Sequence, residues 1–330
     1  METFQALVLD KVNEETTLDI KELTMNDLPE GDVTIRVAYS SVNYKDGLVA
    51  IHNLFVTSYP FVPGIDLAGT IIDSSDERFQ TGDEVIVTSY TLGTGQFGGF
   101  SEIARVPAEW VVPLPKGLSL KEAMILGTAG FTAALSVQRL EDNEVNPSLG
   151  PVLVAGATGG VGSIAVNILA NKGYEVTAST GKTNEESYLK GLGAAHVINR
   201  QEIIDTDQTP MREEKWAGAI DPVGGKTLQY ILSTLKYGGS VATCGLTGGT
   251  AVSTTVLPYI SRGVNWLGID SVQCPMDKRI KVWERLGDDL KPTMLNEDMV
   301  NEISLHELPE VLADILKGNV RGRTLVNLNK

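Results

Sequence analysis

The segment PVLVAGATGGVGSIAVNIL, which begins at Pro151, constrains the fold of this chain more than any other stretch. It reads as a buried strand, a glycine turn and a helix, with Gly156, Gly159 and Gly162 at three-residue spacing. Glycines at such a turn let the backbone approach a pyrophosphate, which binds the unpaired N–H groups at the helix start. Because both the strand and the helix are present, the segment predicts a dinucleotide site rather than an ordinary glycine-rich turn.

The residues after this segment alternate between two patterns. Short apolar runs such as YEVTAST and WAGAIDPVG alternate with amphipathic stretches such as GKTLQYILSTLKYGG. This order is typical of a parallel sheet with helices on both faces. We therefore expect an α/β protein that contains a doubly wound, Rossmann-type domain.

The first 125 residues have a different character, because polar and apolar residues alternate in stretches such as GDVTIRVAYSSVNY and GDEVIVTSY. This pattern predicts a mostly-β domain. A helical pattern begins near Ser119 or Leu120, and the tail ends in a helix, HELPEVLADILKG, and a strand, RTLVNLN, that we assign to the β-rich half. The expected domains are 1–126 with 295–330, and 127–294.

The nucleotide domain also indicates which dinucleotide it binds. An NAD site usually has an acidic residue about 20 residues beyond the glycines, where it bonds the ribose 2′-hydroxyl. Here that place reads Ser179, Thr180, Gly181 and Lys182. A lysine with two hydroxyls can hold a 2′-phosphate, so the sequence favours NADP. The alternative is that Lys182 is an ordinary exposed loop residue.

Net charge and apolar runs restrict the partners and the location. The chain has 27 basic and 42 acidic residues, a net charge of −15, which repels nucleic acid and anionic membranes. Its start, METFQALVLD, lacks the pattern of a signal peptide, and the apolar runs are shorter than a membrane span. With only two cysteines, we expect a cytoplasmic protein with a small-molecule substrate, no nucleic-acid partner and no membrane contact.

A zinc site is not expected. Three histidines and two distant cysteines, with neither a CxxC pair nor an HExxH motif, do not supply the usual ligands. Zinc would otherwise polarise a substrate carbonyl, so a metal-free acid must serve instead.

Several blocks of the chain together resemble one family. SVNYKDGL, PGIDLAGT, GTAGFTAAL, GATGGVGS and RGRTLVNL are similar to the zinc-free quinone oxidoreductase branch of the medium-chain dehydrogenase/reductase superfamily. Within that branch they resemble the YhdH/YhfP group, which includes acrylyl-CoA reductases. The resemblance implies a GroES-like catalytic domain, a Rossmann domain and a homodimer.

The resemblance also implies cofactor contacts in both domains. They lie at Tyr44, Gly156, Gly159, Gly160, Val161, Gly162, Ser179, Thr180, Gly181, Lys182, Arg200, Leu246, Ser271 and Asn327. Related sequences carry arginine in place of Lys182, which keeps the charge. They carry lysine in place of Asn327, so this chain lacks that charge in the tail.

Reduction of an activated C=C bond requires hydride at the β carbon, a stabilised enolate oxygen and a proton for the α carbon. Asn43, Tyr44 and Asp46 lie in a polar turn where zinc relatives carry their first ligand. Tyr44 is our candidate acid or oxyanion donor; alternatively, its ring only packs on nicotinamide. Asp46 is a second catalytic candidate, although a loop-tying role is favoured.

We therefore expect NADPH-dependent reduction of a short 2-enoyl thioester such as acrylyl-CoA. The alternatives are an NADPH:quinone oxidoreductase and an NADPH-binding structural or regulatory protein with little turnover. The stretch YTLGTGQFGGF, 90–100, reads either as a mobile substrate loop or as a structural surface loop. The apolar segment VNWLGIDSV predicts an edge strand through which two copies pair.

Overall fold

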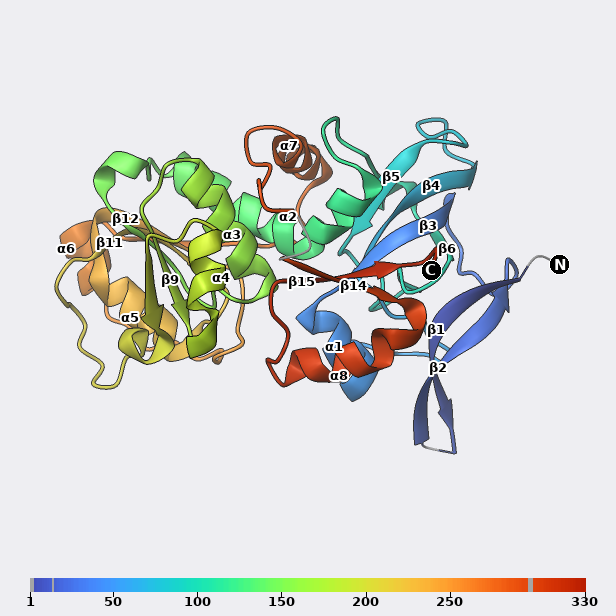
Figure 1. Ribbon diagram of the computed structural model, residues 1–330, viewed down its shortest axis with the longest axis horizontal. Helices are drawn as coiled ribbons and strands as arrows, with labels where there is room; N and C mark the ends of the chain where they lie inside the picture. Colours follow the sequence, from blue (N-terminus) through green and yellow to red (C-terminus); the bar gives the residue numbers. More distant parts are fainter. Residues whose placement is uncertain (1–2, 14, 296–298) are drawn as a thin grey trace. The chain divides into compact units, whose positions relative to one another are not determined.

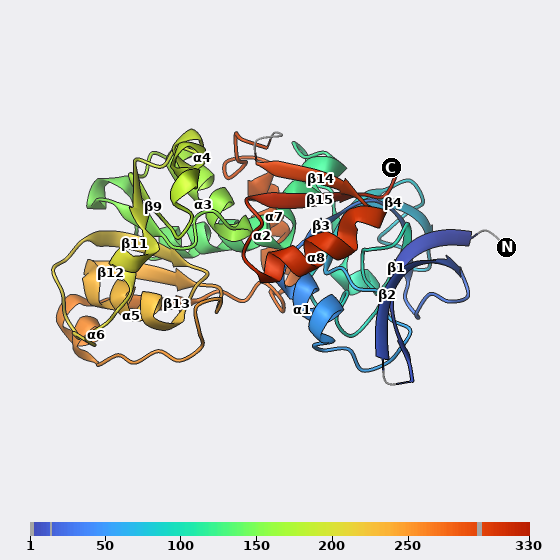
Figure 2. The same cartoon turned by 60° about the horizontal axis from the view of Figure 1, so that its bottom comes forward.

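The computed structural model describes residues 3–13, 15–295 and 299–330, and the chain divides into two compact units. Unit 1 comprises Met1–Thr128, Val272–Asp288 and Leu295–Lys330. Unit 2 comprises Ala129–Ser271 and Asp289–Met294. Figures 1 and 2 show the elements of each unit from two directions.

Unit 1 is built on β-strands. A seven-stranded sheet has the order β14-β15-β3-β4-β5-β7, with β6 paired to β3, and β1 and β2 form a separate antiparallel pair. The strands are β1 Thr3–Val12, β2 Glu15–Thr24, β3 Val33–Val42, β4 Asp66–Ser74, β5 Glu84–Thr88, β6 Ile103–Val106, β7 Val112–Pro113, β14 Val300–Ser304 and β15 Arg323–Asn327.

The tail strand returns to the β-rich half, as the sequence predicts. β15 pairs antiparallel with β3, with Thr324 opposite Val42. The helical elements of this unit are α1 Tyr44–His52, η1 Ala108–Trp110, α7 Met276–Leu286, η5 Leu305–Glu307 and α8 Leu308–Leu316. Helix α1 packs beside α8 (Figure 2). A side chain at Gly47 would lie 2.9 Å from the Leu312 carbonyl oxygen, so this close helix packing requires glycine.

Unit 2 is the doubly wound domain. Its six parallel strands have the order β10-β9-β8-β11-β12-β13. They are β8 Val152–Val154, β9 Val176–Thr180, β10 His196–Asn199, β11 Trp216–Asp221, β12 Leu235–Thr243 and β13 Asn265–Gly268. The central strands β8 and β11 are buried along their whole length, as expected for a sheet covered on both faces.

The helices of unit 2 connect these strands. They are η2 Pro147–Leu149, α3 Gly160–Asn171, η3 Thr183–Glu185, α4 Glu186–Gly191, η4 Arg200–Ile203, α5 Gly225–Thr234 and α6 Leu257–Arg262. Right-handed crossovers run outward in opposite directions from the centre of the sheet. They therefore place α3 and α4 on one face and α5 on the other (Figure 2).

Helix α2, Leu120–Asp142, begins in unit 1 and ends in unit 2. Gly127 interrupts it with φ 52° and ψ −155°. Among the described residues it is the one helix long and apolar enough to cross a membrane, which differs from our expectation, but 78% of its most apolar window is buried inside the protein. Such burial is typical of a core helix.

One boundary differs from the predicted one, because the segment Val272–Asp288 belongs to unit 1. Arg279 of α7 is fully buried and donates from Nη1 to the Thr88 carbonyl oxygen at 3.1 Å and to its Oγ1 at 3.0 Å. Its guanidinium lies 4.4 Å from the centre of the Tyr90 ring. These contacts hold α7 against the β-rich unit, and they join residues too far apart in sequence for the hydrophobic pattern to predict.

The glycine-rich stretch 90–100 is packed rather than loose. Gly98 N donates to the Val62 carbonyl at 2.7 Å, Phe100 N donates to the Pro63 carbonyl at 3.1 Å, and the Phe100 side chain is fully buried. A Cβ at Gly93 would lie 2.5 Å from the Gly64 backbone. The structural interpretation of this loop is therefore favoured over a mobile substrate loop.

Candidate functional site

The glycine turn between β8 and α3 forms the first part of the site. Gly156 has φ +56°, which favours glycine. Gly159 N donates to the Gly156 carbonyl oxygen at 3.0 Å. A Cβ on Gly162 would overlap the Gly156 carbonyl oxygen and lie 2.7 Å from the Ala157 Cα. Only a residue without a side chain lets α3 start this close to the turn.

This turn fits a dinucleotide pyrophosphate. Helix α3 begins at Gly160, and its N-cap, Gly159, has no side chain to bond the first N–H groups. The amides of Gly160, Val161 and Gly162 therefore remain available at the positive end of the helix dipole. The structure brings the five predicted residues of the turn together, and their backbone, rather than their side chains, would hold the cofactor.

The second part of the site lies at the ends of β9 and β10. These strands are parallel, with Thr180 opposite Asn199, so the residues that follow them are neighbours. A Cβ on Gly181 would lie 2.7 Å from the Arg200 Nε, so the Arg200 side chain packs directly against this glycine. Lys182 N donates to the Thr180 hydroxyl at 3.0 Å.

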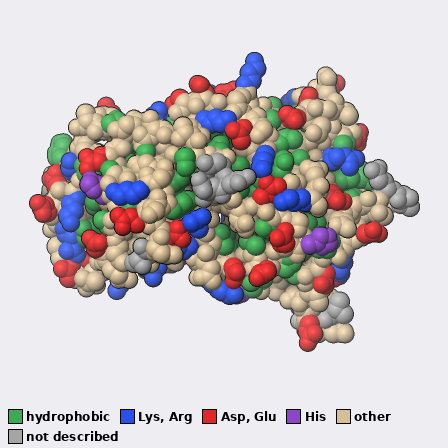
Figure 3. Space-filling view, in the orientation of Figure 1, with side chains coloured by type: hydrophobic (Ala, Val, Ile, Leu, Met, Phe, Trp, Pro, Cys, Tyr) green, Lys and Arg blue, Asp and Glu red, His purple; other side chains and the backbone are tan. Residues whose placement is uncertain are grey.

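No carboxylate ends β9, and Lys182 and Arg200 are half-buried and exposed, respectively. Two cations beside a hydroxyl are the groups that bind a 2′-phosphate. Acidic and basic side chains are interspersed over the face shown in Figure 3, so an anionic cofactor depends on local cations in a chain of net charge −15.

Ser179 lies at the predicted end of β9, and its contact with a cofactor stays a prediction. Its side chain is fully buried, its hydroxyl has no hydrogen-bond partner, and its carbonyl accepts from Ala157 N at 3.0 Å. All five residues of β9 are buried, so the burial of Ser179 follows from the central position of this strand. Its contribution is to join β9 to the glycine turn.

The loops after β11, β12 and β13 also lie at the carboxyl ends of the parallel strands. Asp221 is fully buried, and its carboxylate accepts from Val223 N at 2.9 Å and from Gly224 N at 3.0 Å. Burial raises the pKa of Asp221 to about 6. Beyond β12, Leu246 is 59% exposed, and Ser271 is half-buried in the loop after β13. Leu246 is thus available for a ligand contact.

Unit 1 contains a buried polar network around Asp66, which sequence reasoning missed. Its Oδ2 accepts from the Ser41 hydroxyl at 2.7 Å, Asn43 Nδ2 at 2.7 Å and Thr128 N at 2.9 Å. Its Oδ1 accepts from the Thr128 hydroxyl at 2.5 Å. Thr128 Oγ1 also lies 3.0 Å from the Ser89 hydroxyl. One carboxylate thus connects the end of β3, the start of β4 and the kink of α2.

Arg323 is the cation of this network. Its side chain is buried, with Nε donating to the Ile125 carbonyl at 2.8 Å and Nη1 donating to the Val42 carbonyl at 3.1 Å. Burial lowers the pKa of Arg323, while the charges of Asp66 and Asp46 raise it. A charged residue in the apolar strand RTLVN was the available sequence signal, because an arginine is rarely buried unless it is paired.

Tyr44 is the first residue of α1, and its side chain is 40% exposed. The preceding residue, Asn43, is held by Asp66, so the network fixes the backbone from which Tyr44 projects. An exposed phenol on a fixed turn can donate a hydrogen bond to a bound molecule.

Asp46 ties the same turn together. Oδ2 accepts from Asn43 N and Oδ1 accepts from Ile65 N, both at 2.8 Å, and the side chain is fully buried. Burial, followed by the nearby charge of Asp66, raises the pKa of Asp46 to about 7. The structure therefore favours the loop-tying interpretation over the catalytic one.

The side chain of Asn327 is hydrogen-bonded within unit 1, and the cofactor contact that the resemblance implies there stays a prediction. Its Nδ2 donates to Glu302 Oε1 at 2.8 Å, and its Oδ1 accepts from Asn329 N at 3.0 Å. Both polar atoms are thus used within unit 1, at the end of the β14–β15 pair.

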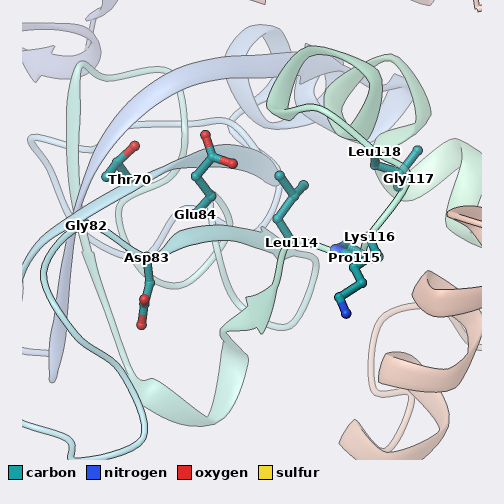
Figure 4. A pocket seen from close by; sticks show the side chains of 9 residues that line it. All are labelled: Thr70, Gly82, Asp83, Glu84, Leu114, Pro115, Lys116, Gly117 and Leu118. Atoms are coloured by element: carbon teal, nitrogen blue, oxygen red, sulfur yellow. The ribbon is translucent and has the colours of Figure 1, made fainter.

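Two further observations limit where the chemistry lies. Among residues 3–13, 15–295 and 299–330, no three His, Cys, Asp or Glu side chains gather as a metal site. Figure 4 shows a groove of unit 1 in which the carboxylates of Asp83 and Glu84 point in opposite directions. Its side chains do not converge, so we do not assign the reaction to it.

Family models match both parts of the chain. The alcohol dehydrogenase GroES-like domain matches residues 29–116, and the zinc-binding dehydrogenase domain matches residues 160–286. Acrylyl-CoA reductase AcuI of Ruegeria pomeroyi is 50% identical over 99% of this chain and 99% of its own length. The quinone oxidoreductase of Sus scrofa is 30% identical over 66% of each chain.

Solved structures agree with this likeness. The yhdH oxidoreductase of Salmonella enterica in complex with NADP has a TM-score of 0.95 and 45% identity, covering 98% of this chain and 99% of that one. Bacillus subtilis yhfP with NAD bound has a TM-score of 0.96 and 54% identity, covering 99% of this chain and all of the other. These two relatives therefore carry different dinucleotides.

Proposed function

This chain belongs to the zinc-free quinone oxidoreductase and acrylyl-CoA reductase group of the medium-chain dehydrogenase/reductase family, and on that premise we propose that it is an NADPH-dependent reductase of short 2-enoyl thioesters such as acrylyl-CoA. The observation that carries the proposal is Tyr44, an exposed phenol on a turn that the buried Asp66 network holds in place. NADPH, when bound, supplies the hydride.

The residues of unit 2 support the choice of NADPH. The amides of Gly160, Val161 and Gly162 would hold the pyrophosphate, and Lys182 and Arg200 would hold the 2′-phosphate. Thr180 and Gly181 position those two cations, and Leu246 offers an apolar contact. The structure of yhfP with NAD makes the comparison of NADPH with NADH the direct test of this assignment.

Unit 1 supports the chemical step. The reduction adds a hydride to the β carbon and a proton to the α carbon, and the thioester oxygen carries negative charge in between. The Tyr44 hydroxyl would donate a hydrogen bond to that oxygen and stabilise it. Asp46, Asp66 and Arg323 act as positioning residues, because they hold the turn without an exposed polar atom of their own.

The experiment is steady-state NADPH consumption with acrylyl-CoA and with a small quinone. We expect turnover of acrylyl-CoA and weaker turnover of the quinone. Brisk quinone reduction with acrylyl-CoA untouched at saturating NADPH would replace this proposal with the quinone alternative. Tight NADPH binding without turnover of either would indicate the structural or regulatory role.

Tyr44 has its own test. If its hydroxyl stabilises the enolate or donates the proton, Tyr44→Phe lowers kcat by about 10² to 10³, the usual cost of one such donor. If the ring only stacks on nicotinamide, phenylalanine keeps most of the activity and Tyr44→Ala mainly raises the KM for the cofactor.

We also propose a homodimer that forms through unit 2. β13 is the edge strand of its sheet, and large exposed apolar side chains lie on or near it: Val256, Leu257, Ile260 and Trp266. A two-fold axis would cover this edge in both copies. Light scattering should give a dimer mass for the wild type and a monomer mass for Ile260→Asp; a monomeric wild type at micromolar concentration would refute the pairing.

The cytoplasm is the location we propose, in line with the two cysteines and the acidic surface. We also propose that catalysis needs no zinc. Elemental analysis should find no stoichiometric metal, and a chelator should leave activity and thermal stability unchanged; one tightly bound zinc per chain would overturn this.

A further inference from the structure

The loops that follow β11 and β12 in unit 2 are bonded to each other. Gly248 N donates to the Val223 carbonyl at 2.7 Å, and the Thr247 hydroxyl donates to the Pro222 carbonyl at 3.3 Å. Because these bonds run from one loop to the other, the two loops behave as one piece of structure. We use the name loop pair for residues 221–225 and 244–249.

Glycines make this close contact possible. Gly224 has φ +72°, and a Cβ there would lie 2.6 Å from the Gly249 carbonyl oxygen. A Cβ on Gly245 would overlap the Pro222 carbonyl oxygen. A side chain at either position would push the two loops apart, so the contact between them depends on glycine.

The loop pair also contacts the glycine turn that follows β8. A Cβ on Gly156 would lie 3.2 Å from Val223 Cγ2 and 3.5 Å from Pro222 Cγ. The side chains of the β11 loop therefore pack against the turn that would hold the pyrophosphate. Since β8, β11 and β12 are neighbours in the sheet, the three loops at their carboxyl ends contact one another in the same order.

One buried carboxylate holds the middle loop of the three. Asp221 Oδ1 accepts from Val223 N at 2.9 Å and from Gly224 N at 3.0 Å, and its Oδ2 accepts from Gly224 N at 3.1 Å. The Asp221 carbonyl accepts from Cys244 N at 2.9 Å, where the β12 loop begins. Burial raises the pKa of Asp221, and the two N–H bonds oppose that rise. Because a buried charge is costly without such bonds, the carboxylate and the shape of the loop depend on each other.

The order of the strands assigns the loop pair to one half of a bound dinucleotide. A dinucleotide binds across the carboxyl edge of a doubly wound sheet, at the point where the strand order reverses. Here the order runs from β8 to β9 and β10 in one direction, and from β11 to β12 and β13 in the other. Lys182 and Arg200, which would hold the 2′-phosphate, follow β9 and β10, so the adenosine half belongs there. The nicotinamide half then belongs over β11 and β12, where Leu246 of the loop pair is exposed.

We propose that Asp221 is a positioning residue for hydride transfer, because it holds the loop pair against which the nicotinamide half of NADPH lies. This inference rests on the proposed function, in which the nicotinamide delivers the hydride. Without the carboxylate, Val223 N and Gly224 N lose their acceptor, and the loop moves until they find another. A displacement of the reacting group by about 1 Å costs on the order of 100-fold in rate, while the adenosine half stays bound.

The test compares Asp221→Ala with Asp221→Asn. In the alanine variant, kcat with acrylyl-CoA should fall about 10- to 100-fold. The primary deuterium isotope effect with NADPH labelled at C4 should rise, because hydride transfer becomes the slow step. NADPH should bind about 10-fold more weakly, whereas adenosine 2′,5′-bisphosphate, which lacks the nicotinamide half, should bind as it does to the wild type. Asparagine keeps an oxygen that accepts both N–H groups, so it should restore kcat to within about threefold of the wild type.

Asn167→Ala is the matched control. The Asn167 side chain is buried in α3, and its oxygen also accepts from two successive N–H groups, Thr293 N at 2.9 Å and Met294 N at 3.3 Å. It lies about 10 Å along the helix axis from the glycine turn. This variant should lower the Tm but keep the kcat, the isotope effect and both affinities of the wild type.

The inference is overturned if Asp221→Ala behaves like the control, with a lower Tm and an unchanged kcat. Equal weakening of NADPH and of the bisphosphate also overturns it, because Asp221 would then support the whole cofactor site. If Asp221→Ala does not fold, Gly245→Ala disturbs the same contact from the β12 loop. It should weaken NADPH but not the bisphosphate, and equal effects on the two would overturn the inference.

The failure of this inference differs from the failure of the proposed function. If the wild type turns over no enoyl-CoA, the proposed function fails. The affinities of the same variants for NADPH and for adenosine 2′,5′-bisphosphate then still test the role of Asp221 through cofactor binding alone.

Discussion

The glycine turn of unit 2 and the buried polar network of unit 1 are built in opposite ways. The turn of unit 2 comes from one continuous segment, Gly156 to Gly162. Its glycines offer backbone groups to a cofactor and carry no side chains that would keep the cofactor away. In unit 1 the polar network joins Ser41, Asp66, Thr128 and Arg323, which are far apart in sequence. The turn of unit 2 depends on the close approach of helix α3 to the backbone of the turn. The network of unit 1 depends on buried charges that compensate one another.

The largest effect should come from breaking the charge balance in unit 1. Arg323→Met leaves Asp66 and Asp46 buried without their cation, which should lower the free energy of unfolding by about 3–5 kcal/mol. Urea titration followed by tryptophan fluorescence measures it. Arg321→Met, two residues away and exposed, should change stability by less than about 0.5 kcal/mol.

Arg323→Met should leave the NADPH affinity of the folded protein unchanged. If the affinity falls severalfold, the network of unit 1 and the glycine turn of unit 2 are not independent of each other. A loss of stability below about 1 kcal/mol would show that the network does not need its cation.

The converse change acts on unit 2. Gly162→Ala places a Cβ against the Gly156 carbonyl and forces the helix start away from the turn. We expect NADPH to bind about 10- to 100-fold more weakly, the equivalent of 1–3 kcal/mol of overpacking strain. Fluorescence titration of bound NADPH measures the change.

Gly191→Ala is the matched control, since nothing lies within 4 Å of a Cβ at that helical glycine of unit 2. It should leave NADPH affinity unchanged. If both variants bind NADPH as the wild type does, the glycine turn does not hold the cofactor.

The choice between NADPH and NADH tests the side chains at the end of β9 in unit 2, where the rest of the cofactor site consists of backbone groups. Lys182→Glu replaces a cation with an anion at the end of β9, so NADPH binding should fall about 10-fold more than NADH binding. Lys190→Glu makes the same charge change on exposed α4 and should affect both cofactors alike. Equal affinity of the wild type for the two cofactors would contradict the NADP assignment.

The smallest effect is a pH dependence from unit 1. The pKa of Asp46 is about 7 in the fold against an ordinary 3.8, so between these values the folded protein binds more protons than the unfolded chain. Stability therefore falls as the pH rises from about 4 to about 7. Asp221, with its pKa raised to about 6, adds a change of the same sign.

Asp46→Asn removes the first contribution and keeps the second. Relative to the wild type, it should gain about 1 kcal/mol of stability on going from pH 6 to pH 7. Urea titrations at the two pH values measure this. The same difference between the two proteins at both pH values would mean that Asp46 titrates near its ordinary pKa.

Several features could be predicted from the sequence alone. The glycine turn, the parallel sheet, the return of the tail strand and the absence of a carboxylate beyond β9 were all legible, because each depends on residues that are neighbours in the chain. Periodicity and turn chemistry are local, and the glycine spacing carries its own structural context.

Tertiary structure alone decided which side chains meet. It buried Ser179, engaged both polar atoms of Asn327 within unit 1, and moved 272–288 into that unit through Arg279. It also buried Asp66 of β4 close enough to Arg323 of β15 for the carboxylate charge to act on the pKa of that arginine. The physical reason is that burial of a charge is tolerable only beside its partner, and the position of that partner follows from the packing of distant strands rather than from any local pattern.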